Sequence, residues 1–436
     1  MKKTLITRAF SILFTLVMVI SLMAPVSMIT ASAATEENSA SSSVSYLKIN
    51  LPGKNFYMVK DTAVLRSSTS IFYSKLATFE KSSIIETSGS TGDFYKVSMK
   101  RDGKTVTGYV KKSELKGYVS SVNAKFCYTN KKAALRQAPF DNGDKVNIEK
   151  GNVLYIVSNL KNSHNNKWVG IFVDGHIRYM FVDNIVRTEK ITVSISGPAF
   201  IKTGSNANFK CTVSPSAISG IKVTCSDTGI ATVNSSGVVT PKAGGSVKLT
   251  VSLPGLVSAS INTNIALNVK PYFQTENYTC SAASTIATLR YLGKAKDVKD
   301  VTLYKKSIDG GYVYKIRDTL NSYLGKNTYC WETFTDIGKY EKAISKSLSK
   351  NYPVIVRVSF PKEYFNYKSS GHITTVTSLY EKDGQTWAIC IDSYVNRHDS
   401  NSYSNSETGE VHVPLEDLYY YNSYEGRDSR YVIFVK

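Results

Sequence analysis

Short segments in which apolar and polar residues alternate fill the chain from residue 46 to residue 270, and Gly, Asn, Asp and Ser clusters separate them. Such segments predict short strands with one buried face, and the turn residues between them favour sandwiches and barrels over helical folds. Beyond residue 270 the pattern changes, because residues 280–293 carry apolar side chains at helical spacing and strands come only later. We therefore predict a multidomain chain with all-β modules up to residue 270 and an α+β domain over residues 271–436.

Two blocks between residues 46 and 186 are loosely similar to each other. The first holds TAVLRSSTS, TGDFYKVSM and TGYVKKSELKG, and the second holds KAALRQAPF, NNKWVGIFV and HIRYMFVDNIV. Repetition at this scale predicts two copies of one module, over residues 46–117 and 118–190. Both blocks resemble bacterial SH3-type domains, and the resemblance implies two small β-barrels that bind cell-wall polymers.

Residues 191–270 are rich in Val and Thr and predict a β-sandwich. The run IATVNSSGVVTPKAGGSVKLTV is similar to the bacterial Ig-like group 2 domain, a module that normally serves as a spacer or adhesive unit. Cys225 stands where such domains usually have Trp, and Cys211 lies on the preceding strand. A disulfide between these two cysteines and a pair of small buried thiols both remain open.

The N-terminus carries Lys2, Lys3 and Arg8, then a short apolar stretch and the small-residue triplet Ala31, Ser32 and Ala33. This order predicts a secretory signal peptide over residues 1–33, with an uncleaved anchor as the alternative. Residues 34–45 are rich in Ser, Ala and Glu and are expected to form a disordered linker. No later stretch is apolar enough to span a membrane, so we expect a secreted, extracellular protein.

The formal net charge of +20 lies mostly between residues 45 and 270. A basic N-terminal part indicates a polyanionic partner, and outside a cell this favours phosphate-bearing wall polymers over nucleic acid. The alternative is that the positive charge only aids solubility. The six cysteines are scattered and form no CxxC or CxxH pair, which argues against a structural zinc site. We expect no metal and no organic cofactor.

Cys280 is a candidate nucleophile because it stands at the start of the predicted helix. The positive end of a helix dipole and its unpaired N–H groups favour a thiolate there. Gln274, six residues upstream, can donate from its amide into the same space as the Cys280 backbone N–H and so complete an oxyanion hole. The alternative interpretation makes Cys280 a small hydrophobe of the core.

His372 and Asp392 are the candidate base and the candidate group that orients it. His372 opens the strand HITTVTSLY, and Asp392 ends the following strand TWAICIDSY. A two-residue turn between these strands would place the two side chains on opposite faces of the sheet. A three-residue turn of Lys382, Asp383 and Gly384 would place them diagonally on one face, and Gly384 in the left-handed position favours this form.

The segments PYFQTENYTCSAAS, SSGHITTVTSLY and ICIDSY resemble those of papain-fold cysteine peptidases, and especially the bacteriocin-processing, double-glycine peptidase-like family. The resemblance covers residues 271–436 and implies that Gln274, Cys280, His372 and Asp392 are catalytic. The family usually has Gly after the nucleophile and Pro after the aspartate, where this chain has Ser281 and Ser393. The sequence thus predicts a secreted, wall-associated cysteine peptidase that acts on peptides or proteins.

Two other functions remain open at this stage. The first is a peptidoglycan hydrolase of the NlpC/P60 or amidase kind, because these enzymes also occur in one chain with SH3-type domains, although they lack the upstream glutamine. A binding or adhesion protein with an inactive peptidase fold is the second alternative, and the intact set of four residues argues against it.

Overall fold

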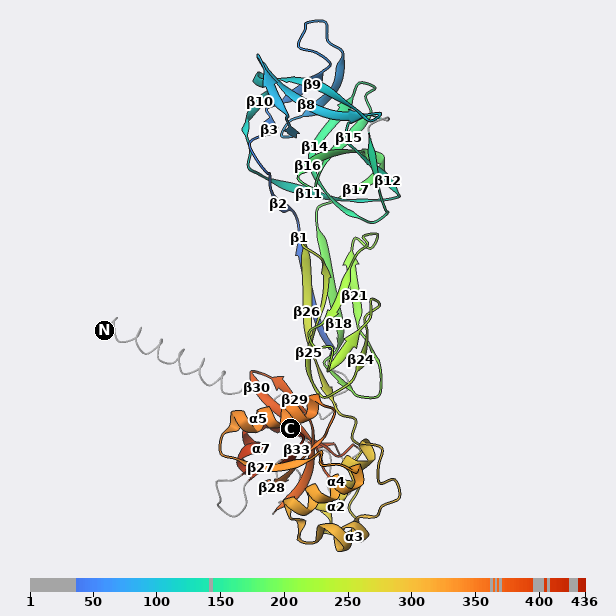
Figure 1. Ribbon diagram of the computed structural model, residues 1–436, viewed down its shortest axis with the longest axis vertical. Helices are drawn as coiled ribbons and strands as arrows, with labels where there is room; N and C mark the ends of the chain where they lie inside the picture. Colours follow the sequence, from blue (N-terminus) through green and yellow to red (C-terminus); the bar gives the residue numbers. More distant parts are fainter. Residues whose placement is uncertain are drawn as a thin grey trace, which may run out of the picture.

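The computed structural model describes residues 37–140, 144–360, 364, 367, 371–394, 404–405, 408–422 and 430–436. The molecule is elongated, with the N-terminal β-modules at one end, a middle β-domain and a C-terminal domain of helices and sheet at the other end (Figure 1). The signal peptide predicted over residues 1–33 lies outside the described residues. Within the described residues, no helix is long and apolar enough to cross a membrane.

The N-terminal part is all β, and the two predicted modules share a continuous sheet and core. The strands of the first are β2 (Leu47–Asn50), β3 (Phe56–Val59), β4 (Thr62–Arg66), β5 (Lys75–Glu80), β6 (Ile84–Glu86), β7 (Gly89–Thr91), β8 (Phe94–Arg101), β9 (Lys104–Lys111) and β10 (Leu115–Tyr118). Those of the second are β11 (Ser121–Thr129), β12 (Ala133–Arg136), β13 (Lys145–Ile148), β14 (Val153–Asn162), β15 (Lys167–Val173), β16 (His176–Phe181) and β17 (Ile185–Thr188). Strand β5 pairs with β14 across the predicted boundary, and Phe79 shares a buried cluster with Trp168.

The middle domain packs short sheets around one apolar core. Its strands are β1 (Glu37–Val44), β18 (Ile191–Pro198), β19 (Phe200–Lys202), β20 (Ala207–Asn208), β21 (Lys210–Ser214), β22 (Lys222–Cys225), β23 (Ala231–Val233), β24 (Val238–Pro241), β25 (Gly245–Leu253) and β26 (Val257–Ala266). Alternate residues of β18, β25 and β26 point inward, as Val193, Leu249 and Ile261 illustrate. Cys211 and Cys225 are free thiols on different sheets, so the disulfide left open by the sequence is not formed.

The prediction of a disordered linker over residues 34–45 is wrong for residues 37–44. Residues 37–44 form strand β1, which pairs antiparallel with β18 along its whole length, from Glu37 opposite Pro198 to Val44 opposite Ile191. The Ser-rich composition suggested disorder because it offers little apolar surface. The unpaired edge of β18 supplies the missing stabilisation through backbone hydrogen bonds, and Ala40 and Val44 also pack against the core.

In its described residues, the C-terminal domain is a seven-stranded antiparallel sheet between two groups of helices. The strand order is β27, β33, β28, β29, β30, β32, β31. The strands are β27 (Cys330–Phe334), β28 (Val354–Val358), β29 (His372–Lys382), β30 (Gln385–Ile391), β31 (Ser404–Asn405), β32 (Glu410–Pro414) and β33 (Arg430–Phe434). The helices are α2 (Cys280–Tyr291), α3 (Asp300–Leu303), α4 (Val313–Leu324), α5 (Ile337–Ser349) and α7 (Leu415–Tyr421).

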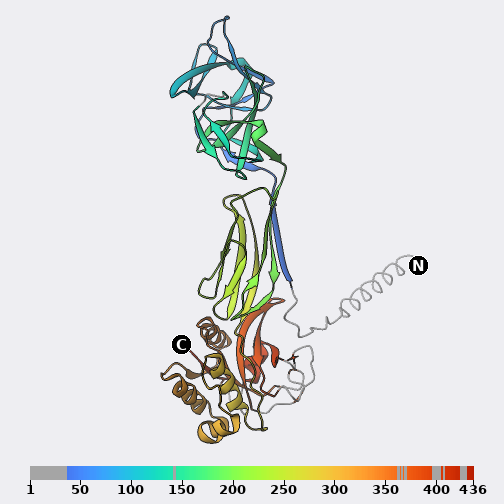
Figure 2. The same cartoon turned by 90° about the vertical axis from the view of Figure 1, so that its right-hand side faces the viewer.

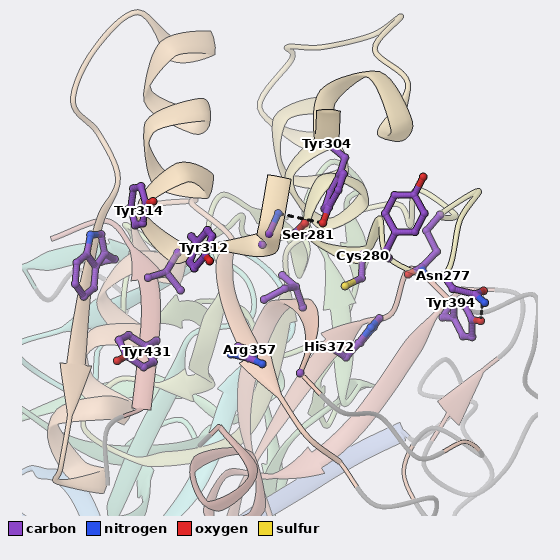
Figure 3. A pocket seen from close by; sticks show the side chains of 18 of the residues that line it. Asn277, Cys280, Ser281, Tyr304, Tyr312, Tyr314, Arg357, His372, Tyr394 and Tyr431 are labelled. Atoms are coloured by element: carbon purple, nitrogen blue, oxygen red, sulfur yellow. Dashed lines mark hydrogen bonds between the residues drawn. The ribbon is translucent and has the colours of Figure 1, made fainter. Parts of the chain in front are cut away.

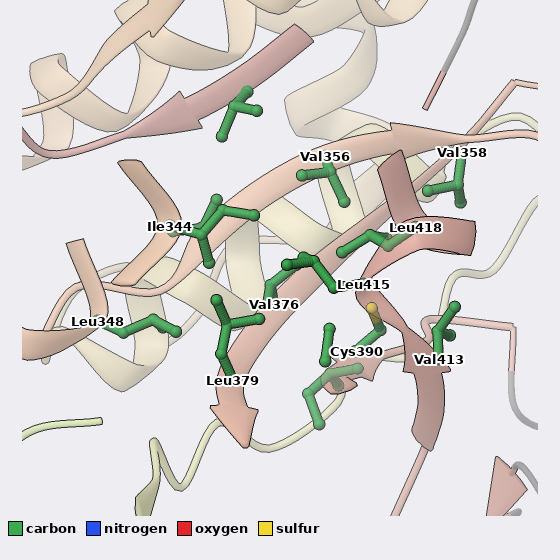
Figure 4. Close-up of a cluster of buried hydrophobic side chains, with 14 of the residues drawn as sticks. Ile344, Leu348, Val356, Val358, Val376, Leu379, Cys390, Val413, Leu415 and Leu418 are labelled. Carbon is green, nitrogen blue, oxygen red and sulfur yellow. The ribbon is translucent and has the colours of Figure 1, made fainter. Parts of the chain in front are cut away.

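Helices cover both faces of this sheet, whereas the sequence predicted one helical layer facing one sheet. Helices α2 and α4 pack on one face, where Ile286 and Ile316 meet Ile373 of β29. Helices α5 and α7 pack on the other face, where Ile344 and Leu418 join a cluster that also contains Val356, Val376 and Cys390 (Figure 4). Burial on both faces explains why the sequence of β28 is almost continuously apolar, because a strand covered on both sides does not alternate apolar with polar residues.

The β29–β30 hairpin has the register that the sequence predicted near His372, but a different feature produces it. Lys382 pairs with Gln385, so the turn has the two residues Asp383 and Gly384, both with positive φ (52° and 77°). The prediction of a three-residue turn is therefore wrong. A β-bulge on β29 between Val376 and Ser378 then shifts the pairing by one residue.

Candidate active site

Cys280 begins helix α2 and is half-buried at the wall of a cleft. Burial of the thiol acts to raise its pKa. A hydrogen bond and the positive charge of His372, together with backbone hydrogen bonds at Ile373 and Ser281, outweigh burial and lower the pKa of Cys280 below its ordinary value of 9.0. The start of the helix adds to this effect, because its dipole favours a negative charge there. The local environment thus stabilises a thiolate.

His372 is the first residue of β29 and follows Gly371, whose φ of 77° favours glycine. Its Nε2 atom lies 2.7 Å from Oδ1 of Asp392. Burial acts to lower the pKa of His372, but the negative charge and hydrogen bond of Asp392, and then Cys280, raise it to about 10. Because Nε2 faces Asp392, the other ring nitrogen, Nδ1, is the one left for the Cys280 thiol.

Asp392 follows β30 directly and is fully buried. Besides His372, its carboxylate accepts hydrogen bonds from the Tyr394 backbone N–H at 3.1 Å and from the Tyr367 hydroxyl at 3.0 Å. The Tyr367 ring also stands edge-on to the His372 ring, with 6.1 Å between centroids and an interplanar angle of 89°. These donors fix the carboxylate in the orientation that faces the imidazole.

Gln274 lines the same cleft as Cys280, as the sequence predicted. Ser393 holds it twice: the Gln274 backbone N–H donates to the Ser393 carbonyl at 3.0 Å, and the Ser393 hydroxyl donates to Gln274 Oε1 at 2.8 Å. The side-chain Nε2 donates to the Glu276 carbonyl at 2.9 Å. An amide nitrogen carries two hydrogens, so one N–H remains for a substrate oxygen.

Asp300 is a residue of the site that sequence reasoning missed. It is fully buried, and its carboxylate accepts hydrogen bonds from the Thr275 N–H at 2.7 Å and from the hydroxyls of Thr275 and Thr279 at 2.9 and 2.6 Å. Burial acts to raise the pKa of Asp300, but these donors lower it below 3.8. Asp300 thereby fixes the loop between Gln274 and Cys280. Nothing in its own short segment signals this role, and the same holds for Tyr367.

The cleft has a volume of about 700 Å³ and is strongly aromatic. Its aromatic lining residues are Tyr278, Tyr304, Tyr312, Tyr314, Trp331, Tyr367, Tyr394 and Tyr431. Figure 3 shows Cys280 and His372 facing the same opening, with Tyr312, Tyr314 and Tyr431 further along it. Among the residues that the structure describes, no group of three His, Cys, Asp or Glu side chains could hold a metal ion.

The arrangement suits nucleophilic chemistry. A thiolate beside an imidazolium can attack an electrophilic carbon, and the imidazolium can then protonate the leaving group. The buried Asp392 keeps the imidazole oriented. Three of the four predicted residues, Gln274, Cys280 and His372, thus line one cleft, and the buried Asp392 is bonded to His372.

Comparison with known proteins assigns the C-terminal domain to the cysteine-type peptidases. Residues 266–425 match the family described as the Peptidase_C39 like family, and this segment contains all four predicted site residues. A search of the curated proteins finds no match.

Two solved structures align with the chain at low similarity. The structure of NlpC1 from Trichomonas vaginalis aligns with 10% identity and a TM-score of 0.15, over 87% of this chain and 96% of that chain. A novel NlpC/P60 endopeptidase from Photobacterium damselae subsp. piscicida aligns with 9% identity and a TM-score of 0.15, over 72% of this chain and 73% of that chain. Neither alignment establishes a shared fold.

Proposed function

We propose that the C-terminal domain, which is a cysteine-type peptidase and therefore a hydrolase, cleaves peptide or protein substrates outside the cell. In this proposal Cys280 is the nucleophile, His372 is the acid and base, and Asp392 is the carboxylate that orients His372. One observation carries this proposal: the 2.7 Å contact between His372 and Asp392 continues to the Cys280 thiol at the wall of an open cleft.

The proposed reaction has two steps. The Cys280 thiolate attacks the scissile carbonyl carbon, and the Cys280 backbone N–H and Gln274 Nε2 donate to the oxyanion that forms. The His372 imidazolium gives its proton to the leaving amine, which leaves an acyl-thioester on Cys280. His372 then takes a proton from water, the resulting hydroxide attacks the thioester, and the acid product and the thiolate are released.

Attachment to the cell wall is the second part of the proposal. The N-terminal modules resemble wall-binding domains and carry much of the positive charge, and Ile71 and Phe72 on their surface are 85% and 89% exposed. The elongated middle domain lies between these modules and the C-terminal domain (Figure 2). We infer that the modules hold wall polymers while the C-terminal domain cuts peptides.

A thiol-directed experiment tests the catalytic part. The full chain is treated with an epoxide or iodoacetamide probe near neutral pH, and the labelled residue is identified by mass spectrometry. We expect Cys280 to be labelled and Cys330, which is half-buried and whose pKa burial raises, to remain unlabelled. Equal labelling of the two cysteines, or none at Cys280, would contradict the proposal.

A digestion experiment identifies the substrate class. Purified peptidoglycan and a pool of extracellular proteins are each incubated with the wild-type chain and with Cys280→Ala. New protein N-termini that depend on Cys280 would support the peptidase. Release of peptidoglycan stem peptides without protein cleavage would instead assign a wall hydrolase.

A sedimentation experiment tests attachment. The Cys280→Ala chain is mixed with purified walls at increasing salt, and the bound fraction is measured. Binding that weakens with salt is expected, because salt screens exposed charges beyond about 10 Å at 0.1 M. Absence of binding would make the modules spacers.

A further inference from the structure

The β-bulge on β29 decides whether His372 and Asp392 can meet. From the turn to Ser378, which lies opposite Ile389, the hairpin follows one register. Beyond the bulge, Val376 lies opposite Cys390 and Thr375 opposite Ile391. Thr377 is the extra residue.

Continuing the register of the turn without this bulge would place Asp392 opposite Thr375. Residues 372 and 375 differ by an odd number and point to opposite faces of a strand. The carboxylate would then lie on the other side of the sheet from His372. The bulge is therefore a structural condition for the 2.7 Å contact between them.

The middle domain holds this bulge from outside the sheet. The extra residue turns its carbonyl out of the ladder, and the Leu267 N–H, directly after β26, donates to that Thr377 oxygen at 2.9 Å. The neighbouring Ser378 hydroxyl donates to the carbonyl of Ile265, within β26, at 3.2 Å. Thr377 and Ser378 are both buried, so no water can replace these partners.

Further contacts fix the two domains to each other around the same hairpin. The Phe200 ring packs edge-on against Tyr380, with 4.7 Å between centroids. Lys202 forms an ion pair with buried Glu410, which lies opposite Ile391 in the sheet. Gly244 approaches the bulge so closely that an added Cβ would lie 3.3 Å from the Thr377 carbonyl oxygen. Figure 2 shows the hairpin meeting the base of the middle domain.

We propose that the junction with the middle domain positions the catalytic pair, because Leu267, directly after β26, and Ile265 within β26 bind the Thr377 bulge and so keep Asp392 on the face of His372. The inference rests on the proposed function of that pair. A buried carbonyl without a partner typically costs about 1–3 kcal/mol. The Leu267 N–H removes this cost for the bulged register alone, so the segment that joins the middle domain to the sheet stabilises the active register over the shifted one. Leu267, Ser378 and Thr377 are positioning residues and contact no substrate.

The test compares Leu267→Pro with Leu267→Ala in the full chain. Both lose the leucine side chain, but only proline also removes the N–H donor. We expect Leu267→Pro to have a kcat at least about 10-fold below that of Leu267→Ala, with a smaller change in KM. The alkaline limb of its kcat/KM profile should also move to lower pH. The reason is that His372, which Cys280 and Tyr367 still face, no longer has the Asp392 carboxylate beside it to raise its pKa.

A double mutant separates this inference from the proposed function. If Asp392 acts only through the bulged register, Leu267→Pro should add little to the loss caused by Asp392→Asn. Equal kcat and equal pH profiles for Leu267→Pro and Leu267→Ala would overturn the positioning role. Unchanged activity of Asp392→Asn alone would instead overturn the proposed catalytic pair.

A milder variant decides the matter if Leu267→Pro fails to fold. Ser378→Ala removes the second contact with β26, and Thr386→Ala, which removes an exposed hydroxyl near the turn of the same hairpin, is its control. We expect a several-fold lower kcat and the same alkaline shift for Ser378→Ala only. Indistinguishable profiles for the two would overturn the inference.

Discussion

Two buried ion pairs, one at each end of the molecule, differ in what their surroundings allow them to do. In the first β-module, the two terminal guanidinium nitrogens of Arg66 each donate a hydrogen bond to one carboxylate oxygen of Glu114. Their side chains are 6% and 19% exposed. In the C-terminal domain, His372 and Asp392 are 8% and 0% exposed. Burial and pairing alone therefore do not distinguish a structural pair from a catalytic one.

The difference lies in the third partner. Arg66 is capped by the Tyr73 ring at 5.0 Å, and an arginine does not give up its proton at ordinary pH. His372 can change its protonation state and contacts a cysteine at the wall of a cleft. A buried ion pair becomes a candidate site when one member titrates and faces a nucleophile.

The largest expected effect concerns that nucleophile. Cys280→Ala should reduce peptide hydrolysis below detection, because the variant lacks the sulfur on which the proposed acyl intermediate forms. Cys390→Ala is the control, since Cys390 is fully buried in the core and burial raises its pKa. Measured kcat/KM values that are equal for wild type and Cys280→Ala would remove the distinction between the two ion pairs.

The next effect concerns the orienting carboxylate. Asp392→Asn should lower kcat/KM by about 10²–10⁴-fold, as the loss of such a group does in other triads. The pKa of His372 should also fall, because the Asp392 charge raises it. The alkaline limb of the pH profile should therefore move to lower pH. Asp383→Asn in the turn of the same hairpin should change neither quantity, and a similar loss in both variants would point to hairpin stability instead.

A somewhat smaller loss is expected at the oxyanion donor. Gln274→Ala removes a hydrogen bond that strengthens in the transition state, which typically costs about 10²–10³-fold in kcat. Gln385→Ala, at the start of β30, is the matched control. A change in kcat below twofold for Gln274→Ala would show that Gln274 is only a loop residue held by Ser393 and not a catalytic donor.

The smallest effect on activity is expected at the other ion pair. Arg66→Met leaves the partly exposed Glu114 without its partner and should destabilise the first module by up to about 3 kcal/mol, the lower end of the cost for a fully buried pair. Denaturant unfolding measures that loss. Peptide hydrolysis below the unfolding transition should stay unchanged, and a parallel loss of kcat would mean that the first module contributes to the active site.

The sequence predicted more of the candidate site than of the contacts that support it. Cys280, His372 and Asp392 were predictable because each stands at the end of a helix or strand whose pattern is readable. Their register was predicted through a glycine turn, whereas a bulge at Thr377 produces it. The bulge depends on a hydrogen bond from Leu267, which is distant from Thr377 in the sequence, so no local pattern encodes it. Asp300 and the pairing of β1 with β18 also arise from contacts between distant segments.

The most direct test of the account is the pH dependence of Cys280 alkylation by iodoacetamide, followed residue by residue with mass spectrometry. A lowered pKa at Cys280 and a raised pKa at Cys330 predict that Cys280 reacts rapidly well below pH 9, where Cys330 remains unreactive. In Asp392→Asn, the Cys280 curve should move to higher pH, because a less basic His372 stabilises the thiolate less. If Cys280 and Cys330 instead titrate together near pH 9 or above, no thiolate–imidazolium pair exists and the catalytic assignment is wrong.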